Sequence, residues 1–321
     1  MKSPARVLSI MALAAAGAVF AQGYPNRPIK VVVPWPPGQA TDTAARVVTE
    51  KMGASMGQQF VIDNRAGAGG TIGTDIAAKS AADGYTILAG SSGPISISPK
   101  VQKVPYDPDK DFEPICLMAT SPYVLVTNSS LPVANVTELI ALLRANPGKY
   151  TFASSGTGAT AHLISEFFSL SANVTARHVP YKGSAPAITD LIAGHVDYAF
   201  ETSSAVLGHV KAGRLKALGV SSGVRAMALP ELPTVAEAAN LQGFDMRAWI
   251  GLVAPAGMPR EIRARLSAEC QKVVDAPEVK EKLLSLGLEP GGLATAEFGD
   301  FIRRQNERFG AIARGANIKL D

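Results

Sequence analysis

Short apolar segments rich in β-branched residues alternate with helical patterns along most of the chain, and this alternation limits the possible folds more than any other feature. A strand, a helix and a further strand in succession predict a parallel sheet with helices on both faces. The predicted strands cover 29–33, 60–63, 85–89, 150–153, 177–180, 196–200 and 215–220. The predicted helices cover 42–56, 71–80, 159–170, 185–193, 205–212, 259–274, 278–286 and 296–313. The sequence therefore predicts an α/β protein with a helical C-terminal region.

Two long apolar segments, 115–127 and 245–254, interrupt the alternation without an intervening helix. We interpret them as crossings between two lobes, which fits a chain of 321 residues. The chain would then form lobe one from 24–121 and 251–321, and lobe two from 122–250.

The N-terminal segment predicts export. Lys2 and Arg6 precede a charge-free run from Val7 to Phe20, which has the length of a signal-peptide core and is shorter than a membrane span. Val19 and Ala21 are small residues suited to a cleavage site. We therefore expect 1–21 to be a signal peptide, with the exact cut left open and no insertion of the mature chain into a membrane.

Charge and cysteine content exclude several classes of protein. The net charge is +4 and no basic block occurs, so nothing indicates nucleic-acid binding. The two cysteines, Cys116 and Cys270, are too few for a disulfide framework. We expect two separately buried thiols, while a single bridge between them stays open.

Four loops that follow predicted strands carry residues suited to an anion. Ligands of parallel α/β sheets bind at the carboxyl ends of strands, where helix N-termini offer free N–H groups. These loops are 34–42, 64–71, 153–162 and 180–186. In the first, Thr41 or Asp42 can cap the next helix. In the third, Gly156, Gly158 and Ala161 fit a permissive dinucleotide pattern, but its acidic partner is missing.

Catalytic patterns are missing from the sequence. The segment 90–93 (GSSG) has the wrong spacing for a nucleophile elbow, and no H-E-x-x-H occurs. We interpret His162 as structural and Lys182 as a solvated side chain at the rim of a site. We therefore expect no enzyme activity, no cofactor and no metal.

Several motifs occur in a fixed order along the chain. They are 34–38 (PWPPG), 64–73 (NRAGAGGTIG), 82–86 (ADGYT), 106–108 (YDP), 179–183 (VPYKG), 191–197 (LIAGHVD), 232–237 (LPTVAE) and 249–257 (WIGLVAPAG). Together they resemble the Bug family, the TctC-like extracytoplasmic solute receptors of tripartite tricarboxylate transporters. The resemblance implies a type II periplasmic-binding-protein fold, with two α/β lobes around a central cleft joined by two crossing strands.

The resemblance also implies a function and a site. A monomeric periplasmic receptor would hold a small carboxylate between the lobes, largely through backbone N–H groups and bridging water, and deliver it to membrane transporter subunits. A periplasmic sensor that feeds a signalling protein is the alternative. The implied ligand-binding residues are Trp35, Gly38, Gln39, Ala40, Thr41, Asp42, Ser91, Ser92, Ser154, Ser155, Thr157, Gly158, Ala159, Thr160, Tyr181, Lys182 and Glu201.

Two positions depart from the family pattern and bear on the ligand. Gln39 stands where a second glycine is usual, and Glu201 stands near the cleft where Asp or another residue is frequent. An ionised Glu201 would repel a second carboxylate, and the Trp35 indole could stack on a flat ring. These features favour an acid with one carboxylate end and a neutral, donor-bearing or aromatic other end over a tricarboxylate. Aliphatic, amino-acid and aromatic ligands all stay open.

Overall fold

The predicted alternation of strands and helices is confirmed in the computed structural model, which describes residues 23–315. The expected signal peptide lies outside the described residues. The strands are β1 (Ile29–Val33), β2 (Phe60–Asn64), β3 (Thr86–Ser91), β4 (Phe112–Asn128), β5 (Thr151–Ser154), β6 (Arg177–Pro180), β7 (Tyr198–Thr202), β8 (Leu215–Val220), β9 (Arg247–Pro255) and β10 (Glu289–Pro290).

Most helices follow a strand directly, as the sequence predicts. They are α2 (Ala40–Met56), α3 (Thr71–Ala78), α4 (Ser98–Val101), α5 (Val136–Ala145), α6 (Thr160–Ala172), α7 (Ser184–Ala193), α8 (Ser203–Lys211), α9 (Val235–Ala239), α10 (Arg260–Asp275), α11 (Pro277–Ser285) and α12 (Thr295–Gly315). Two short turns of helix, η1 (Ala68–Gly70) and η2 (Gly93–Ile97), lie in loops of lobe one. No helix within 23–315 is both long and apolar enough to cross a membrane.

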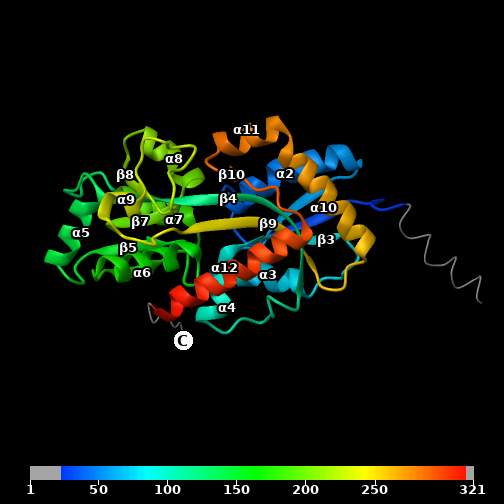
Figure 1. The fold of residues 1–321 in the computed structure, drawn as a ribbon, viewed down its shortest axis with the longest axis horizontal. Coiled ribbons are helices and arrows are strands. Elements are labelled where there is room, and N and C mark those ends of the chain that lie inside the picture. Colours follow the sequence, from blue (N-terminus) through cyan, green and yellow to red (C-terminus); the bar gives the residue numbers. More distant parts are fainter. Residues whose placement is uncertain (1–22, 316–321) are drawn as a thin grey trace, which may run out of the picture.

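Strand β4 joins the two ends of the molecule (Figure 1). Its first part pairs with β9 and β10, and its second part, from Tyr123 onward, pairs with β7 and β8. The strand order is β2-β1-β3-β9-β4-β7-β5-β6, so hydrogen bonding runs through β4 from one lobe to the other. The two predicted crossing strands are therefore β4 and β9. We propose that the lobe boundaries lie where β4 changes partners, at the divisions expected from the sequence.

Each lobe contains the parallel arrangement that the alternation predicts. In lobe one, β1 pairs in parallel with β2 and β3. In lobe two, β5 pairs in parallel with β6 and β7. The loops that leave these strands at their carboxyl ends therefore gather at one edge of each lobe's sheet, which is where α/β proteins bind ligands.

Helix α5 was not expected from the sequence, although its cap and apolar spacing indicate a helix. Asn135 accepts a hydrogen bond from the Glu138 N–H at 2.9 Å and so caps the first turn. Leu139, Ile140 and Leu143 are buried on one face of the helix, at the spacing of an amphipathic helix.

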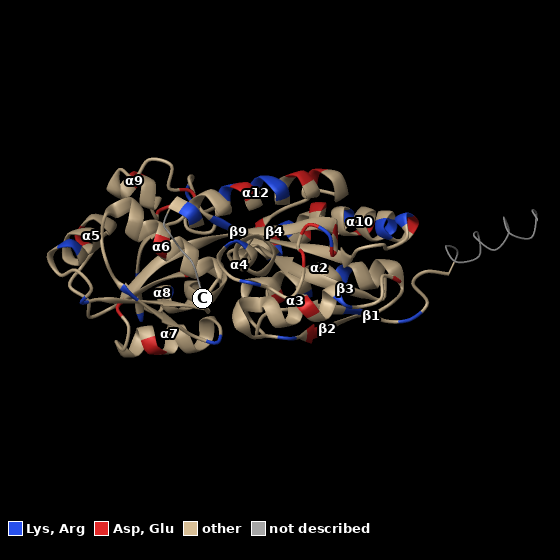
Figure 2. Cartoon of the chain, turned by 90° about the horizontal axis from the view of Figure 1, so that it is seen from below, with Lys and Arg blue, Asp and Glu red and all other residues tan. Residues whose placement is uncertain are grey.

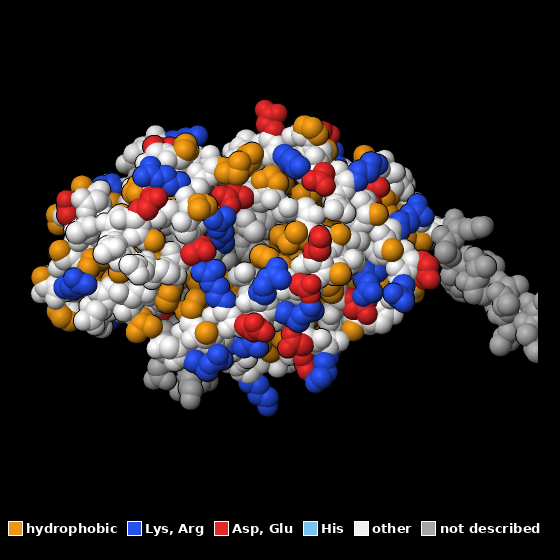
Figure 3. Space-filling model, viewed as in Figure 1, with side chains coloured by type: hydrophobic (Ala, Val, Ile, Leu, Met, Phe, Trp, Pro, Cys, Tyr) orange, Lys and Arg blue, Asp and Glu red, His pale blue; other side chains and the backbone are white. Residues whose placement is uncertain are grey.

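The C-terminal helices return to lobe one and to the crossing strands. Helix α10 packs against α2 and β4, while α12 packs against β4 and η2 and also touches α6. Basic and acidic residues alternate along α12 and α10 (Figure 2), and side chains of both signs are interspersed over the face shown in Figure 3. This mixture of charge agrees with solvated helix faces rather than with a patch for a polyanion.

The expectation of two separate thiols is wrong, because Cys116 and Cys270 form a disulfide. It joins β4 to α10 across 154 residues of sequence, with a Cα–Cα distance of 6.4 Å. Both cysteines are fully buried among apolar residues of lobe one. The strand and the helix that carry the two cysteines are far apart in the sequence and meet only when lobe one packs. The spacing of the cysteines along the chain therefore does not predict the bond.

We expect reduction of this disulfide to lower the free energy of unfolding by about 3 to 5 kcal/mol, because a long loop in the unfolded chain loses its closure. Urea unfolding of the oxidised protein, the reduced protein and Cys116→Ala/Cys270→Ala measures the change. Reductant should shift the wild-type transition and leave the double variant unaffected. Equal stability of oxidised and reduced wild-type protein would contradict the prediction.

Candidate functional site

Loops from both lobes enclose a cavity of about 340 Å³. Five of the expected site residues line it: Trp35, Ser155, Thr157, Tyr181 and Lys182. The lining that the expected set omitted comprises Pro36, the loop 66–70, Gln102, Gly156, Pro180 and Gly183. All of these except Gln102 lie in the four loops that the sequence singles out, and the glycines of 64–71 suit close approach of a ligand or a second backbone.

The two lobes also contact each other directly. Ser92 Oγ lies 3.0 Å from Thr160 Oγ1, and Ser98 Oγ donates to the Gly158 carbonyl at 3.3 Å. In each pair the first residue belongs to lobe one and the second to lobe two. The structure is therefore a closed arrangement of the two lobes.

Glycines allow this close approach. A Cβ on Gly69, whose φ is +63°, would lie 2.6 Å from the Thr157 carbonyl oxygen. A Cβ on Gly183, whose φ is +112°, would lie 2.9 Å from Gln39 Nε2. Both positions combine a left-handed backbone with a contact to the opposite lobe, so a side chain there would hold the lobes apart.

Asp42 shapes the first loop through its own hydrogen bonds. One carboxylate oxygen accepts from the Gly38 N–H and from Arg46 Nε, both at 2.9 Å, and the other accepts from Asn64 Nδ2 at 2.9 Å. Burial alone would raise the pKa of Asp42, but the bonds from Arg46, Gly38 and Asn64 outweigh it and hold the pKa below its usual value. Both oxygens are thus engaged within lobe one, which assigns Asp42 to positioning the loop.

The first turn of α2 offers free backbone donors. The helix begins at Ala40 with Gln39 as its N-cap, so the expected capping by Thr41 or Asp42 is wrong. The Gln39 side chain makes no cap bond, and the N–H groups of Ala40 and Thr41 have no acceptor among the described residues. These two donors sit at the positive end of a 17-residue helix.

The lobe-two loop offers a matching set of donors. The N–H groups of Ser155, Thr157 and Thr160 have no acceptor in the described part of the chain. The N–H of Gly158, by contrast, is used within the lobe, because it donates to His162 Nδ1 at 3.3 Å. Thr160 begins α6, whose first turn likewise lacks a side-chain cap.

Trp35 connects the first loop to its neighbours. Its Nε1 donates to Ser91 Oγ at 2.9 Å, and only 7% of the residue is exposed. Ala159 of lobe two packs in the same apolar cluster, so the indole lies at the junction of the lobes. Trp249 is elsewhere: it is buried edge-on against Phe298, with ring centroids 5.6 Å apart.

Tyr181 and Lys182 follow β6 and form part of the rim. The Tyr181 hydroxyl donates to Asp190 at 2.7 Å, and burial together with this carboxylate raises the pKa of Tyr181 to about 12. Lys182 is exposed, in agreement with its interpretation as a solvated rim residue.

Glu201 is a buried carboxyl group at the carboxyl end of β7. Only 1% of it is exposed; its Oε2 accepts from Ser184 Oγ at 2.7 Å, while its Oε1 has no partner. Burial raises the pKa of Glu201 to about 7, although bonds from Ser184 and the Thr202 N–H oppose the shift. Gln39 Nε2, in the loop of the opposite lobe, is also buried without a partner. Each lobe therefore contributes one unpartnered polar atom at the positions that depart from the family pattern.

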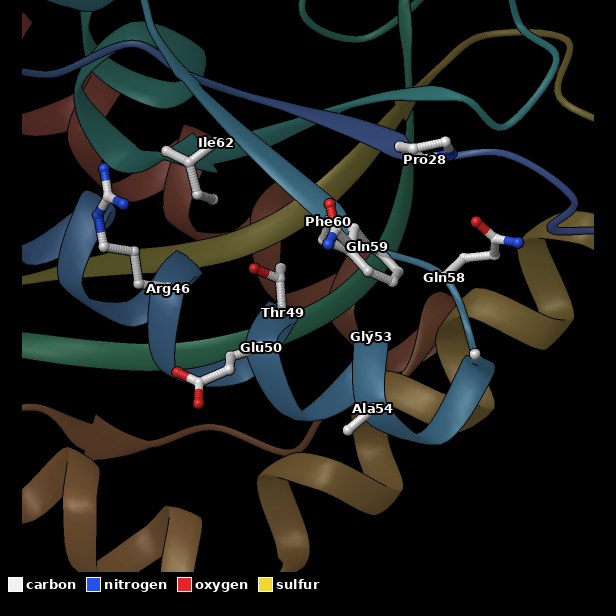
Figure 4. Close-up of a pocket in the computed structure, with 11 residues that line it drawn as sticks. Pro28, Arg46, Thr49, Glu50, Gly53, Ala54, Gln58, Gln59, Phe60 and Ile62 are labelled. Atoms are coloured by element: carbon white, nitrogen blue, oxygen red, sulfur yellow. The ribbon is translucent and has the colours of Figure 1, made fainter.

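A larger hollow of about 790 Å³ lies away from these loops, between α2 and β2 (Figure 4). Its lining includes Thr49 and Glu50 of α2 and Phe60 and Ile62 of β2, and none of the expected site residues. The Arg46 guanidinium at its edge already binds Asp42 and Asn64. Within 23–315, no group of three or more His, Cys, Asp or Glu residues could hold a metal ion.

Two α/β lobes that meet around a cavity, with loops of both lobes in its lining, are the arrangement of a solute-binding receptor. The family described as the tripartite tricarboxylate transporter family receptor (TctC) matches residues 44–318, and the chain belongs to this family. Protein BugT of Bordetella pertussis is 38% identical over 307 residues, which are 95% of this chain and 94% of BugT.

Two solved structures of similar proteins share the fold. Rpa4515 of R. palustris, solved with adipate, superposes with a TM-score of 0.89 at 34% identity, over 92% of this chain and 99% of that protein. MatC (Rpa3494) from Rhodopseudomonas palustris, solved with bound malate, gives a TM-score of 0.84 at 30% identity, over 90% and 99% of the two chains. The expected type II periplasmic-binding-protein fold is confirmed. The family is one of solute-binding receptors, which is not an enzyme class.

Glu201 should make stability depend on pH. Its pKa rises from 4.5 to about 7 on folding, so the native state keeps a proton that the unfolded state releases. The free energy of unfolding of the wild type therefore falls as the pH rises from 4.5 to about 7. Glu201→Gln cannot ionise and lacks this decrease. We expect the advantage of Glu201→Gln to grow by up to about 3 kcal/mol between pH 4.5 and pH 7.

Urea unfolding at pH 4.5, 6 and 8 measures this difference, with Glu50→Gln on the exposed face of α2 as the control. A stability difference between wild type and Glu201→Gln that does not change with pH would show that Glu201 ionises in the folded protein as it does in water.

Proposed function

We propose that this protein is a periplasmic receptor that captures a small organic acid between its lobes and delivers it to a tripartite tricarboxylate-type membrane transporter. The observation that supports this most strongly is the set of unbonded N–H groups on facing loops, Ala40 and Thr41 in lobe one and Ser155, Thr157 and Thr160 in lobe two. Such donors at helix N-termini favour a carboxylate, which accepts several hydrogen bonds at once.

The available donors bear on the affinity that such a receptor needs. A micromolar Kd corresponds to about 8 kcal/mol. A hydrogen bond to a charged group contributes roughly 1.5–3 kcal/mol, so the five donors together would contribute roughly 7.5–15 kcal/mol before association costs. The adipate and malate held by the two similar R. palustris proteins also support a carboxylate ligand.

Glu201 bears on which acid is held. With its pKa near 7, it is protonated at lower pH and donates to an acceptor, whereas at higher pH it is ionised and repels a second carboxylate. We therefore propose that one carboxylate of the ligand lies on the N–H groups. The other end is neutral, donor-bearing or aromatic when Glu201 is ionised, and Trp35 forms a wall of the pocket.

A carboxylate screen tests the proposed function. Thermal shift and calorimetry on residues 22–321 would compare benzoate, adipate, malate and citrate at pH 6 and pH 8, for wild type and Glu201→Gln. We expect at least one acid to raise Tm, because ligand binding stabilises the native state. We also expect adipate and citrate to bind wild type less well at pH 8 than at pH 6, a difference that Glu201→Gln reduces.

Two outcomes would contradict parts of the proposal. If no carboxylate binds and a metal ion or dinucleotide binds tightly, the proposed function is wrong. If citrate binds wild type most tightly at pH 8 and Glu201→Gln changes nothing, Glu201 does not select the ligand.

The loop backbone should matter more than the rim charge. Gly158 has φ +76°, and a Cβ there would lie 3.0 Å from Ser98 Oγ and 3.3 Å from Gln102 Nε2 of lobe one. We expect Gly158→Val to reduce affinity by about tenfold or more through backbone strain and hindered closure. Lys182→Ala should cost less than about fivefold, because an exposed charge contributes little.

Titration of the best-binding acid from the screen measures both variants, with circular dichroism and Tm as the check on folding and Gly158→Ala as a milder substitution. Loss of binding in Lys182→Ala together with normal affinity in both Gly158 variants would indicate a side-chain clamp instead.

A further inference from the structure

Two histidines stack on each other next to the lobe-two loop 154–158. The rings of His162 and His178 are parallel within 10°, with centroids 4.0 Å apart, and Phe152 extends the stack at 4.9 Å from His178. His162 is buried, and burial together with the neighbouring His162 ring lowers the pKa of His178 to about 3. His178 is therefore a neutral hydrogen-bonding group and not a charge.

Each ring reaches the loop through a different nitrogen. His162 accepts the Gly158 N–H at Nδ1, 3.3 Å away. Its ring proton therefore sits on Nε2, which faces Glu166 Oε1 at 3.6 Å. His178 Nε2 lies 2.6 Å from Ser154 Oγ.

Ser154 links His178 to the loop backbone. Its Oγ accepts the Gly156 N–H at 3.2 Å and lies 3.1 Å from the Gly156 carbonyl oxygen. The N–H groups of Gly156 and Gly158 thus donate within lobe two, to Ser154 and His162 respectively. The N–H groups of Ser155 and Thr157, which alternate with them along the chain, are left without an acceptor in the described structure.

We propose that His162 and His178 are positioning residues, which hold the loop 154–158 so that the N–H groups of Ser155 and Thr157 stay available for a ligand. This inference rests on the proposed function. Neither ring needs to touch the ligand. The stack fixes the two imidazoles relative to each other, and each ring then fixes one point of the loop, so the donors are oriented before the ligand arrives.

Amide side chains can separate the bonding role of each ring from its packing. An asparagine at 162 or 178 places its amide near the position of Nδ1, whereas a glutamine places it near Nε2. His162→Asn and His178→Gln therefore keep the atom that binds the loop, while His162→Gln and His178→Asn lose it. All four variants lose a stacked ring, so the two members of each pair are matched for the loss of stacking.

Amide hydrogen exchange, measured by NMR without ligand, reports on the hydrogen bonds of the Gly156 and Gly158 amides. We expect the Gly158 amide to exchange about 3- to 12-fold faster in His162→Gln than in His162→Asn, and the Gly156 amide to show the same difference between His178→Asn and His178→Gln. Adipate titration by calorimetry should show a loss of affinity of similar size in the same members of each pair.

Equal exchange rates and equal adipate affinities within each pair would overturn the positioning role. If exchange shows the expected pattern but wild type binds none of the screened carboxylates, the histidines position the loop and the proposed function is what fails. Urea unfolding of the four variants measures how much the lost stacking lowers stability. Loss of stacking alone should lower stability equally within each pair.

Discussion

The backbone of β4 must find hydrogen-bond partners along 17 residues, most of them buried, and the rest of the structure depends on how it does so. Its first part lies between β9 and β10 and its second part between β7 and β8. One continuous strand thus belongs to two sheets that are otherwise built from separate stretches of the chain. This strand connects the lobes, and loops from both line the cavity between them.

The chemistry of the cleft comes from what these loops leave unbonded. A buried N–H without an acceptor costs about 1–3 kcal/mol. The loops around Ala40 and Ser155 keep such groups, while neighbouring donors are taken up by Asp42, Ser154 and His162. Side chains accept from some of these N–H groups and not from others. Under the proposed function, the N–H groups left free would bind a ligand group that supplies several acceptors.

The sequence predicted the elements well because each depends on a local pattern. The strands at 29–33, 177–180 and 215–220 have the expected bounds, and the loop positions follow from the geometry of parallel sheets. Partners distant in sequence were not predictable in the same way. The Cys116–Cys270 bond, the bonds that engage Asp42 and the anchoring of Gly158 by His162 each depend on where separate elements pack. Helix α5 was missed despite a local signal, its Asn135 cap.

The disulfide has a topological consequence. Cys116 precedes the point at which β4 changes partners, and Cys270 follows the return of the chain through β9, so the ring closed by the disulfide contains all of the chain assigned to lobe two. The disulfide links β4, the strand that enters lobe two, to α10, the helix that follows the exit strand β9. We therefore expect the two ends of lobe two to stay close together even when that lobe is unfolded, as long as the disulfide is intact.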